Sequence, residues 1–283
     1  MNHAASFVNN LPAYLDRLPC VKPAWSDFTS VIDVAKKTIL DHRTPNHFVE
    51  LEMRFGKRNA QGFQAGLTAV AFQNLEARFD SGRDWAKVLD WHNSTAYYHT
   101  NVQGNKLIRT ETTYSPGCEE SRRIECTYKD LIVNHDYRTI SLSADGTTGV
   151  DLRVAVNVEN AVPEGDIPLD IIPSSVHLKV RKCYFYAPTG CDTPVWCYML
   201  TKRWIGETLP EASKRKLEQP PTYEIEMECL SPEYLASKDS AQVATKMLSK
   251  ACDVLEIIDY NLHDHNSFIF EPAGSNMLWT RKK

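Results

Sequence analysis

Two short segments of the chain, residues 49–56 and 223–229, alternate a charged residue with a large apolar one. Successive side chains of a β-strand point to opposite faces, so each segment would carry its charges on one face. The residues on these charged faces are Glu50, Glu52 and Arg54 in the first segment and Glu224, Glu226 and Glu228 in the second. If both faces line one enclosed space, two close carboxylates repel each other by roughly 4 kcal/mol at an effective dielectric constant of about 20. Such a cluster requires a divalent metal, basic side chains or both. The alternative is the solvated face of an antiparallel sheet.

Composition limits the remaining possibilities. The chain has 283 residues and a formal net charge of −4, so no broad basic surface attracts nucleic acid and any anion site must be local. No apolar run approaches membrane-spanning length, and residues 1–10 lack the basic and apolar blocks of a secretory signal. None of the eight cysteines forms a CxxC pair, so we expect reduced thiols and no zinc site.

The periodicity predicts β-strands between two helices. Apolar residues at helical spacing predict an N-terminal helix at about 23–41 and a C-terminal helix at about 231–260. Alternating segments between turn signals predict about nine strands within residues 47–229. The other expected features are a helix at 67–79, strands at 123–133 and 137–143, and an irregular tail from Asn261. Without repeats or an evident linker, residues 1–283 are expected to form a single domain.

Several expected strands carry charge of both signs on one face. In residues 151–159 one face is aliphatic, whereas Asp151, Arg153 and Glu159 share the other. The other such pairs are Lys179 with Arg181 and Arg109 with Glu111. The core of a sandwich would not tolerate these charges, but a barrel with a polar lumen and helices over its apolar exterior would. The sequence therefore favours an α+β, mainly β fold built on a closed barrel.

Carboxylates that face basic side chains across such a lumen suit a polyphosphate. Oxygen ligands select Mg²⁺ or Mn²⁺, arginine binds phosphate through paired donors, and lysine acts as a point charge. The chain has no P-loop, no Gly-x-Ser-x-Gly elbow and no HExxH helix. Taken singly, Arg109, Lys179 and Arg181 are better explained as solvated strand residues. A position in the lumen becomes the better explanation only if all three residues lie opposite the acidic strands.

The two acidic segments resemble the glutamate motifs of the triphosphate tunnel metalloenzymes, most closely the RNA 5′-triphosphatases of mRNA capping in yeasts, protozoa and viruses. These enzymes are eight-stranded antiparallel β-barrel tunnels that remove the γ-phosphate of nascent RNA with Mg²⁺ or Mn²⁺. The resemblance follows most of residues 47–229 in order, and the two acidic segments are its only specific motifs.

The resemblance also implies roles for individual residues. The metal would be bound by Glu50, Glu52 and Glu228, with Glu224 and Glu226 completing an acidic wall that holds metal-bound water. Either Glu159 or Glu226 would orient the attacking water, while Arg109, Lys179 and Arg181 would neutralise the developing charge. The residues expected to contact phosphate are Arg54, Arg109, Arg153, Lys179, Arg181, Thr201 and Arg203.

One expected strand departs from the family pattern. The family has Arg-x-Asp-x-Thr before the second acidic segment, and of residues 196–201 only Thr201 agrees. Arg203 lies two residues later. Either it supplies the missing charge through a shifted register, or this wall of the tunnel is less basic.

Three functions remain open. The first is a metal-dependent RNA triphosphatase, which Arg54 favours because relatives with other substrates more often carry lysine at this position. The second is another enzyme on the same tunnel, acting on inorganic tripolyphosphate, thiamine triphosphate or a nucleoside triphosphate, or cyclising ATP. The third is a non-catalytic β-rich binding protein.

A capping function would imply further partners. The chain lacks the Lys-x-Asp-Gly motif of a covalent lysine–GMP intermediate, so guanylyl transfer would need a separate chain or domain. The expected partners are the 5′-triphosphate end of RNA, a guanylyltransferase and, as in some relatives, a second copy of the chain. The expected location is intracellular, either in the nucleus of a cell or at a viral replication site. A membrane is not an expected partner.

Overall fold

The computed structural model describes residues 22–42, 46–102, 106–115, 118–141, 149–163, 172–258 and 268–276. Its helices are α1 (Lys22–Asp41), α2 (Ala69–Ser81), α3 (Leu209–Glu218), α4 (Pro232–Ser237) and α5 (Ser240–Ile258). Its strands are β1 (His47–Asn59), β2 (Gly62–Ala65), β3 (Lys87–Val102), β4 (Lys106–Ser115), β5 (Cys118–Ser141), β6 (Asp151–Ala161), β7 (Ser175–Tyr186), β8 (Trp196–Gly206), β9 (Thr222–Cys229) and β10 (Phe268–Asn276). The ends of the expected single domain, residues 1–21 and 277–283, lie outside the described residues.

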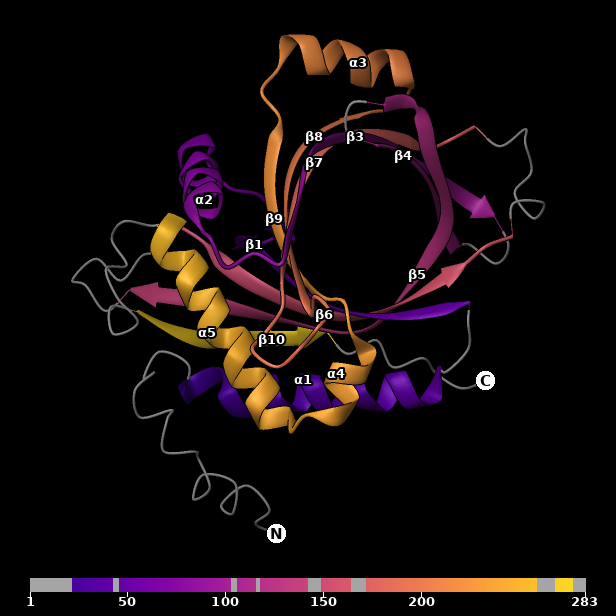
Figure 1. The fold of residues 1–283 in the computed structure, drawn as a ribbon. Coiled ribbons are helices and arrows are strands. Elements are labelled where there is room, and N and C mark those ends of the chain that lie inside the picture. The colour runs from indigo at the N-terminus through magenta and orange to yellow at the C-terminus, as the bar shows by residue number, and fades with distance from the viewer. Residues whose placement is uncertain are drawn as a thin grey trace.

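Eight of the strands close into an antiparallel barrel. Around the ring their order is β1, β6, β5, β4, β3, β7, β8 and β9, and β9 pairs with β1 to complete it. The short strand β2 folds back on β1 as a hairpin, and β10 pairs with the end of β5. Figure 1 looks into the ring of strands. The prediction of a closed, mainly β barrel is confirmed.

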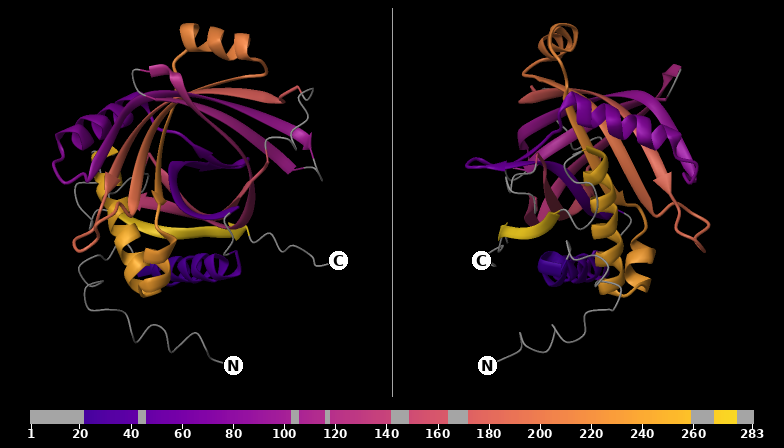
Figure 2. Two further views of the ribbon diagram at one scale, coloured as in Figure 1. Left: turned by 45° about the vertical axis from the view of Figure 1, so that its right-hand side comes forward. Right: turned by 90° about the vertical axis from the view of Figure 1, so that its left-hand side faces the viewer.

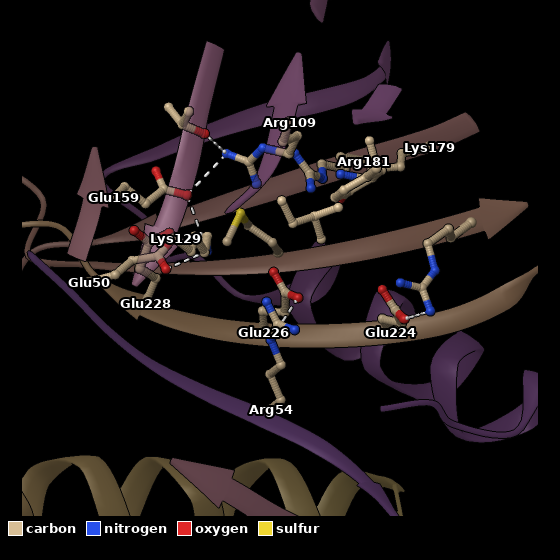
Figure 3. A pocket seen from close by; sticks show the side chains of 15 residues that line it. Glu50, Arg54, Arg109, Lys129, Glu159, Lys179, Arg181, Glu224, Glu226 and Glu228 are labelled. Carbon is tan, nitrogen blue, oxygen red and sulfur yellow. Dashed lines mark hydrogen bonds and ion pairs between the residues drawn. The ribbon is translucent and has the colours of Figure 1, made fainter. Parts of the chain in front are cut away.

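The barrel has its apolar face outside. On β1, Leu51, Met53 and Phe55 are fully buried and belong to the hydrophobic core. The alternate residues Glu50 and Arg54 point into the lumen (Figure 3). The period of two that separates the faces in the sequence therefore decides which side chains reach the lumen.

Helices cover the apolar exterior on one side. Figures 1 and 2 show α1, α4 and α5 against the same side of the barrel, with α3 on the opposite side. The indole Nε1 of Trp25 on α1 donates a hydrogen bond of 3.1 Å to Thr245 Oγ1 on α5. Asp27 on α1 accepts one of 2.9 Å from the Tyr137 hydroxyl on β5 and lies 2.8 Å from His135 Nδ1. None of the described helices is both long and apolar enough to cross a membrane.

The expectations for the C-terminal part were partly wrong. The helix expected at 231–260 is two helices, because Asp239 Oδ1 accepts from the backbone N–H groups of Ala241 and Gln242 and so caps a new helix start. Residues 259–260 of that expectation lie outside the described part. The tail expected to be irregular contains β10, which gains its backbone partners from β5.

The two strands expected at 123–133 and 137–143 are one long strand, β5, as far as the described residues extend. Its pairing with β6 shifts register between Leu131 and Val133. Such a bulge inserts one residue and changes which side chains face inward. Past the bulge, Asn134 faces the lumen, whereas His135 contacts α1.

Candidate functional site

The lumen holds a cavity of about 370 Å³ with charged walls. Figure 3 shows Glu50, Glu159, Glu228 and Lys129 gathered at one end, Glu226 with Arg54 near the middle, and Glu224 and Lys179 towards the other end. The predicted site residues that line it are Glu50, Arg54, Arg109, Glu159, Lys179, Arg181, Arg203, Glu224, Glu226 and Glu228. Strands far apart in the sequence thus bring most of these side chains to one space.

The two acidic segments lie side by side as neighbours in the sheet. Glu52 on β1 stands opposite Glu228 on β9, and Arg54 stands opposite Glu226. The guanidinium of Arg54 lies 3.0 Å from Glu52 and 3.1 Å from Glu226. Although burial alone would raise the pKa of Glu226, Arg54 and Arg181 lower it to about 2.

The other end of the acidic wall has more negative charge than positive. Burial raises the pKa of Glu50 to about 7, and the charges of Glu52 and Glu159 add to the rise despite the neighbouring Lys129. Burial and then the charge of Glu50 raise the pKa of Glu228 well above its ordinary value. Raised carboxylate pKa values identify acids that lack enough compensating cations.

Lys129 on β5 is the main internal cation at this end. Its ammonium donates to Glu50 and lies 3.2 Å from Glu159. Burial alone would lower the pKa of Lys129, but Glu50, Glu52 and Glu159 raise it overall. Lys129 alternates with Thr127 and Leu131 on the same strand, but no acidic or basic pattern in the sequence marks it as a site residue.

Glu111 on β4 organises the basic wall. Its carboxylate lies 3.0 Å from Arg181, 3.2 Å from Lys179 and 3.6 Å from Arg109. Ser94 donates a further hydrogen bond of 2.7 Å. Burial opposes ionisation of Glu111, but Arg181, Lys179 and Arg109 hold its pKa well below the usual range. Strand alternation predicts that Glu111 lies on the same face as Arg109, but the sequence indicates no role for Glu111.

Two basic residues have environments that suit contact with an anion. Burial and the charge of Arg181 lower the pKa of Lys179 to about 7, so an arriving anion would favour its protonated form. Arg109 lies 3.0 Å from Glu159 and donates to Thr127 at 3.2 Å. It therefore links the basic wall to the acidic end.

Strand β8, whose sequence departs from the family pattern, keeps a regular register with β9 from Trp196 to Arg203. Of the two alternatives for this strand, a shifted register is not needed to bring Arg203 to the lumen, because simple alternation places it on the lumen face with Thr201. Arg203 lies 2.6 Å from Glu224. Thr201 is buried and lies outside the linings of both lumen cavities, and its hydroxyl has no hydrogen-bond partner among the described residues.

Two predicted residues that do not line the first cavity, Arg153 and Glu52, line a second cavity of about 660 Å³. Both cavities share Arg54, Lys129, Arg203 and Glu224 in their linings, so they adjoin. Arg153 is held by Asp136, with its Nε at 2.6 Å and its Nη2 at 3.0 Å from the two carboxylate oxygens. Arg153 thus belongs to a different part of the lumen from Lys179 and Arg181.

The carboxylates suit a hard divalent cation by their donor chemistry. Within the part of the chain that the structure describes, no three acidic, histidine or cysteine side chains form a ready metal cluster. Burial and neighbouring carboxylates disfavour the charged forms of Glu50 and Glu228, and bound Mg²⁺ or Mn²⁺ would stabilise these charged forms. Asn157 donates to Glu52 at 3.0 Å and to Glu50 at 3.3 Å, and so orients two of these donors.

Comparison with solved structures identifies the fold. The RNA triphosphatase Pct1 of S. pombe is 12% identical to this chain and superposes with a TM-score of 0.52, covering 82% of this chain and 91% of that one. Its complex with the Spt5 CTD gives 12% identity and a TM-score of 0.53, covering 82% and 93%. This chain has the tunnel fold.

A viral structure is similar at a lower score. The RNA triphosphatase domain of a mimivirus mRNA capping enzyme is 11% identical and gives a TM-score of 0.47, covering 82% of this chain and 97% of that one. No protein-family model and no curated protein sequence matches the chain. At 12% identity, the superposition on Pct1 shows the fold alone.

Proposed function

We propose that this chain is a metal-dependent RNA 5′-triphosphatase that removes the γ-phosphate of nascent RNA. The observation that carries the proposal is the arrangement of the lumen, where the acidic strands β1 and β9 adjoin a basic wall centred on Glu111. Phosphoryl transfer depends mainly on positioning and charge neutralisation, which such a lumen supplies. The similarity of the fold to RNA triphosphatases supports the same substrate class.

Three carboxylates are proposed to hold the metal: Glu50, Glu52 and Glu228. When bound, Mg²⁺ or Mn²⁺ would neutralise charge on the triphosphate and on these acids. Glu224 and Glu226 are proposed to complete the acidic wall around metal-bound water. Both already interact with arginines, Glu224 with Arg203 and Glu226 with Arg54.

The basic wall is proposed to bind the triphosphate. Arg109, Lys179 and Arg181 line the same cavity as the acidic wall and would contact phosphate oxygens. Arg54 and Arg203 also line this cavity and are proposed to contact phosphate, although they are paired with Glu226 and Glu224, as the other three are with Glu111 and Glu159. Thr201 and Arg153 remain weaker candidates, because neither lines this cavity.

The attacking water is proposed to be oriented by Glu159. Glu226 was the other candidate, but its pKa of about 2 makes it a poor proton acceptor. Glu159 lies within 3.0 Å of Arg109 and 3.2 Å of Lys129, between the basic and acidic walls. Water attacks the γ-phosphorus, the bond to the β–γ bridging oxygen breaks, and orthophosphate and a 5′-diphosphate end are released.

A phosphate-release assay tests the proposal. Triphosphate-ended RNA, ATP and inorganic tripolyphosphate should be compared with Mg²⁺ and with Mn²⁺. We expect release from RNA, and its loss in Glu52→Ala and Glu226→Ala. Glu218→Gln, an exposed change on α3, is the matched control. Wild-type rates in both lumen variants would refute the assignment, and cleavage of tripolyphosphate alone would favour the alternative phosphohydrolase.

The cellular context is part of the proposal. Because the chain lacks the guanylyltransferase motif, we propose that a separate chain or domain transfers GMP. Action on nascent RNA would place the protein in a nucleus or at a viral replication site, and we propose a homodimer as its assembly. Co-purification with a guanylyltransferase and light scattering of the pure chain test these two points.

A further inference from the structure

The second lumen cavity differs chemically from the first. Besides the four residues it shares with the triphosphate cavity, its lining includes an aromatic ring, three side-chain amides, an arginine, a hydroxyl, the carboxylate of Glu52 and three aliphatic side chains. The aromatic, amide, arginine and hydroxyl side chains are Phe63, Gln64, Asn134, Asn157, Arg153 and Thr222. Its volume of about 660 Å³ falls within the range of roughly 300–1,000 Å³ that is common for small-ligand sites.

An arginine and an aromatic ring lie together in this lining. The guanidinium of Arg153 lies over the ring of Phe63, 4.7 Å from its centroid. Asp136 holds the same guanidinium through two hydrogen bonds, so a carboxylate already offsets its charge. Aromatic rings and guanidinium groups are the side chains on which nucleobases stack, so this pair suits a base.

An unpaired acceptor faces the same cavity. Asn134 is 8% exposed, and its Oδ1 accepts no hydrogen bond within the described ranges of the chain. The β5 bulge is what turns this side chain into the lumen. A buried amide oxygen without a donor is unfavourable unless a ligand supplies one. The N–H groups of a nucleobase are donors of this kind.

The cations of the second cavity already have carboxylate partners. Arg153 is paired with Asp136, Arg203 with Glu224, Arg54 with Glu52 and Glu226, and Lys129 with Glu50 and Glu159. A neutral base and ribose would leave these pairs intact.

We propose that the second cavity binds the nucleoside at the 5′ end of the substrate while its triphosphate occupies the first cavity. This inference rests on the proposed function, and it specifies a nucleotide rather than an inorganic polyphosphate as the substrate. Two of the residues shared by the two linings, Arg203 and Glu224, lie at the end of the first cavity away from Lys129 and would be where the phosphate chain meets the ribose.

Specificity between two substrates tests the inference. The ratio of kcat/KM for ATP to that for inorganic tripolyphosphate should be measured for the wild type, Phe63→Ala, Phe63→Trp and Asn134→Ala. We expect the ratio to fall about tenfold in Phe63→Ala, because the stacking surface is lost. Phe63→Trp keeps an aromatic surface and should retain most of the ratio. Asn134→Ala should lower it several-fold and provides a second test if Phe63→Ala fails to fold.

The outcomes separate this inference from the proposed function. If the wild type cleaves both substrates and neither alanine variant changes the ratio, the nucleoside site is wrong while the phosphohydrolase proposal stands. If the wild type cleaves nothing, the phosphohydrolase proposal is wrong, and calorimetry with β,γ-methylene-ATP and tripolyphosphate decides on the nucleoside site. Weaker binding of the ATP analogue alone by the alanine variants supports it, and equal changes for both ligands overturn it.

Discussion

The Nε of Arg54 lies 3.1 Å from Oε1 of Glu226, the residue directly opposite it in the ladder between β1 and β9. The same guanidinium reaches Glu52 on its own strand at 3.0 Å. One cation therefore joins the two acidic segments, which are far apart in the chain. Its donors are engaged by carboxylates, so its first role is to keep the acidic strands together.

Replacing Arg54 with Met should destabilise the fold. Breaking a buried ion pair from one side typically costs about 3–5 kcal/mol, because the remaining charge stays buried. The side chain of Arg54 is 34% exposed, so we expect about 2–3 kcal/mol in the free energy of unfolding by urea. Arg215→Met is the matched control, because its pair with Glu211 lies on the surface and should contribute much less to stability. Equal losses in both variants would contradict a bridging role for Arg54.

Stability should depend on pH through Glu50. Its pKa in the folded protein is about 7, above the ordinary value of 4.5. The corresponding stability is complete below about pH 4.5 and is lost as the pH rises through 7. Glu50→Gln resembles the protonated acid and should remove part of this decline, on the order of 1–3 kcal/mol between about pH 5 and 8. Urea unfolding in EDTA measures this difference, and parallel pH curves for the two proteins would count against it.

Manganese should stabilise the protein through the same carboxylates. A ligand at about 100 times its Kd adds roughly 2.7 kcal/mol to the folded state, which corresponds to a rise of about 5 °C or more in Tm. We expect this rise for the wild type with Mn²⁺ and little of it for Glu228→Gln. Glu218→Gln should respond like the wild type. An unchanged Tm for the wild type at millimolar Mn²⁺ would favour the non-catalytic alternative.

The lumen faces of β1 and β9 could be predicted because strand alternation is a local rule, and the residues there keep a regular register. The same rule predicted the lumen positions of Arg109, Lys179 and Arg181, because their strands have a regular register at these positions. Asn134 and Asp136 could not be found in this way. The bulge in β5 reverses the alternation after Leu131, and its position depends on pairing with β6.

Other differences also arise from contacts between distant parts of the chain. Lys129 is inconspicuous in the sequence, and only closure of the barrel brings it to Glu50 and Glu159. Strand β10 follows a stretch without a recognisable pattern and gains its structure by pairing with β5. By contrast, the break between α4 and α5 could have been predicted locally, because Asp239 is a typical residue to cap a helix start. The apolar spacing over residues 231–260 favoured one continuous helix instead.

The pH dependence of catalysis should reveal Lys179. Burial and the neighbouring Arg181 lower its pKa to about 7, so the free protein loses this charge as the pH rises through neutrality. Because kcat/KM reports groups in the free enzyme, it should fall above about pH 7. Lys179→Arg keeps the charge at all these pH values and should flatten this fall, at some cost in absolute rate because the geometry differs. An identical alkaline limb in both proteins would exclude Lys179 as its source.

Gly56 should be essential for the position of the β2 hairpin. A Cβ atom there would lie 2.0 Å from the carbonyl oxygen of Gln64, so Gly56→Ala has to displace β2 from β1. We expect a loss of about 2 kcal/mol or more in the free energy of unfolding, as for other overpacked positions. Gly190→Ala is the matched control, since its φ of 83° is unfavourable for alanine but no atom lies within 4 Å. Gly190→Ala should cost only about 1 kcal/mol.

Because Phe63 lies on β2, Gly56→Ala should also lower the specificity for ATP over tripolyphosphate, and Gly190→Ala should not. A Gly56→Ala protein as stable and as selective as the wild type would show that the hairpin is held by other contacts.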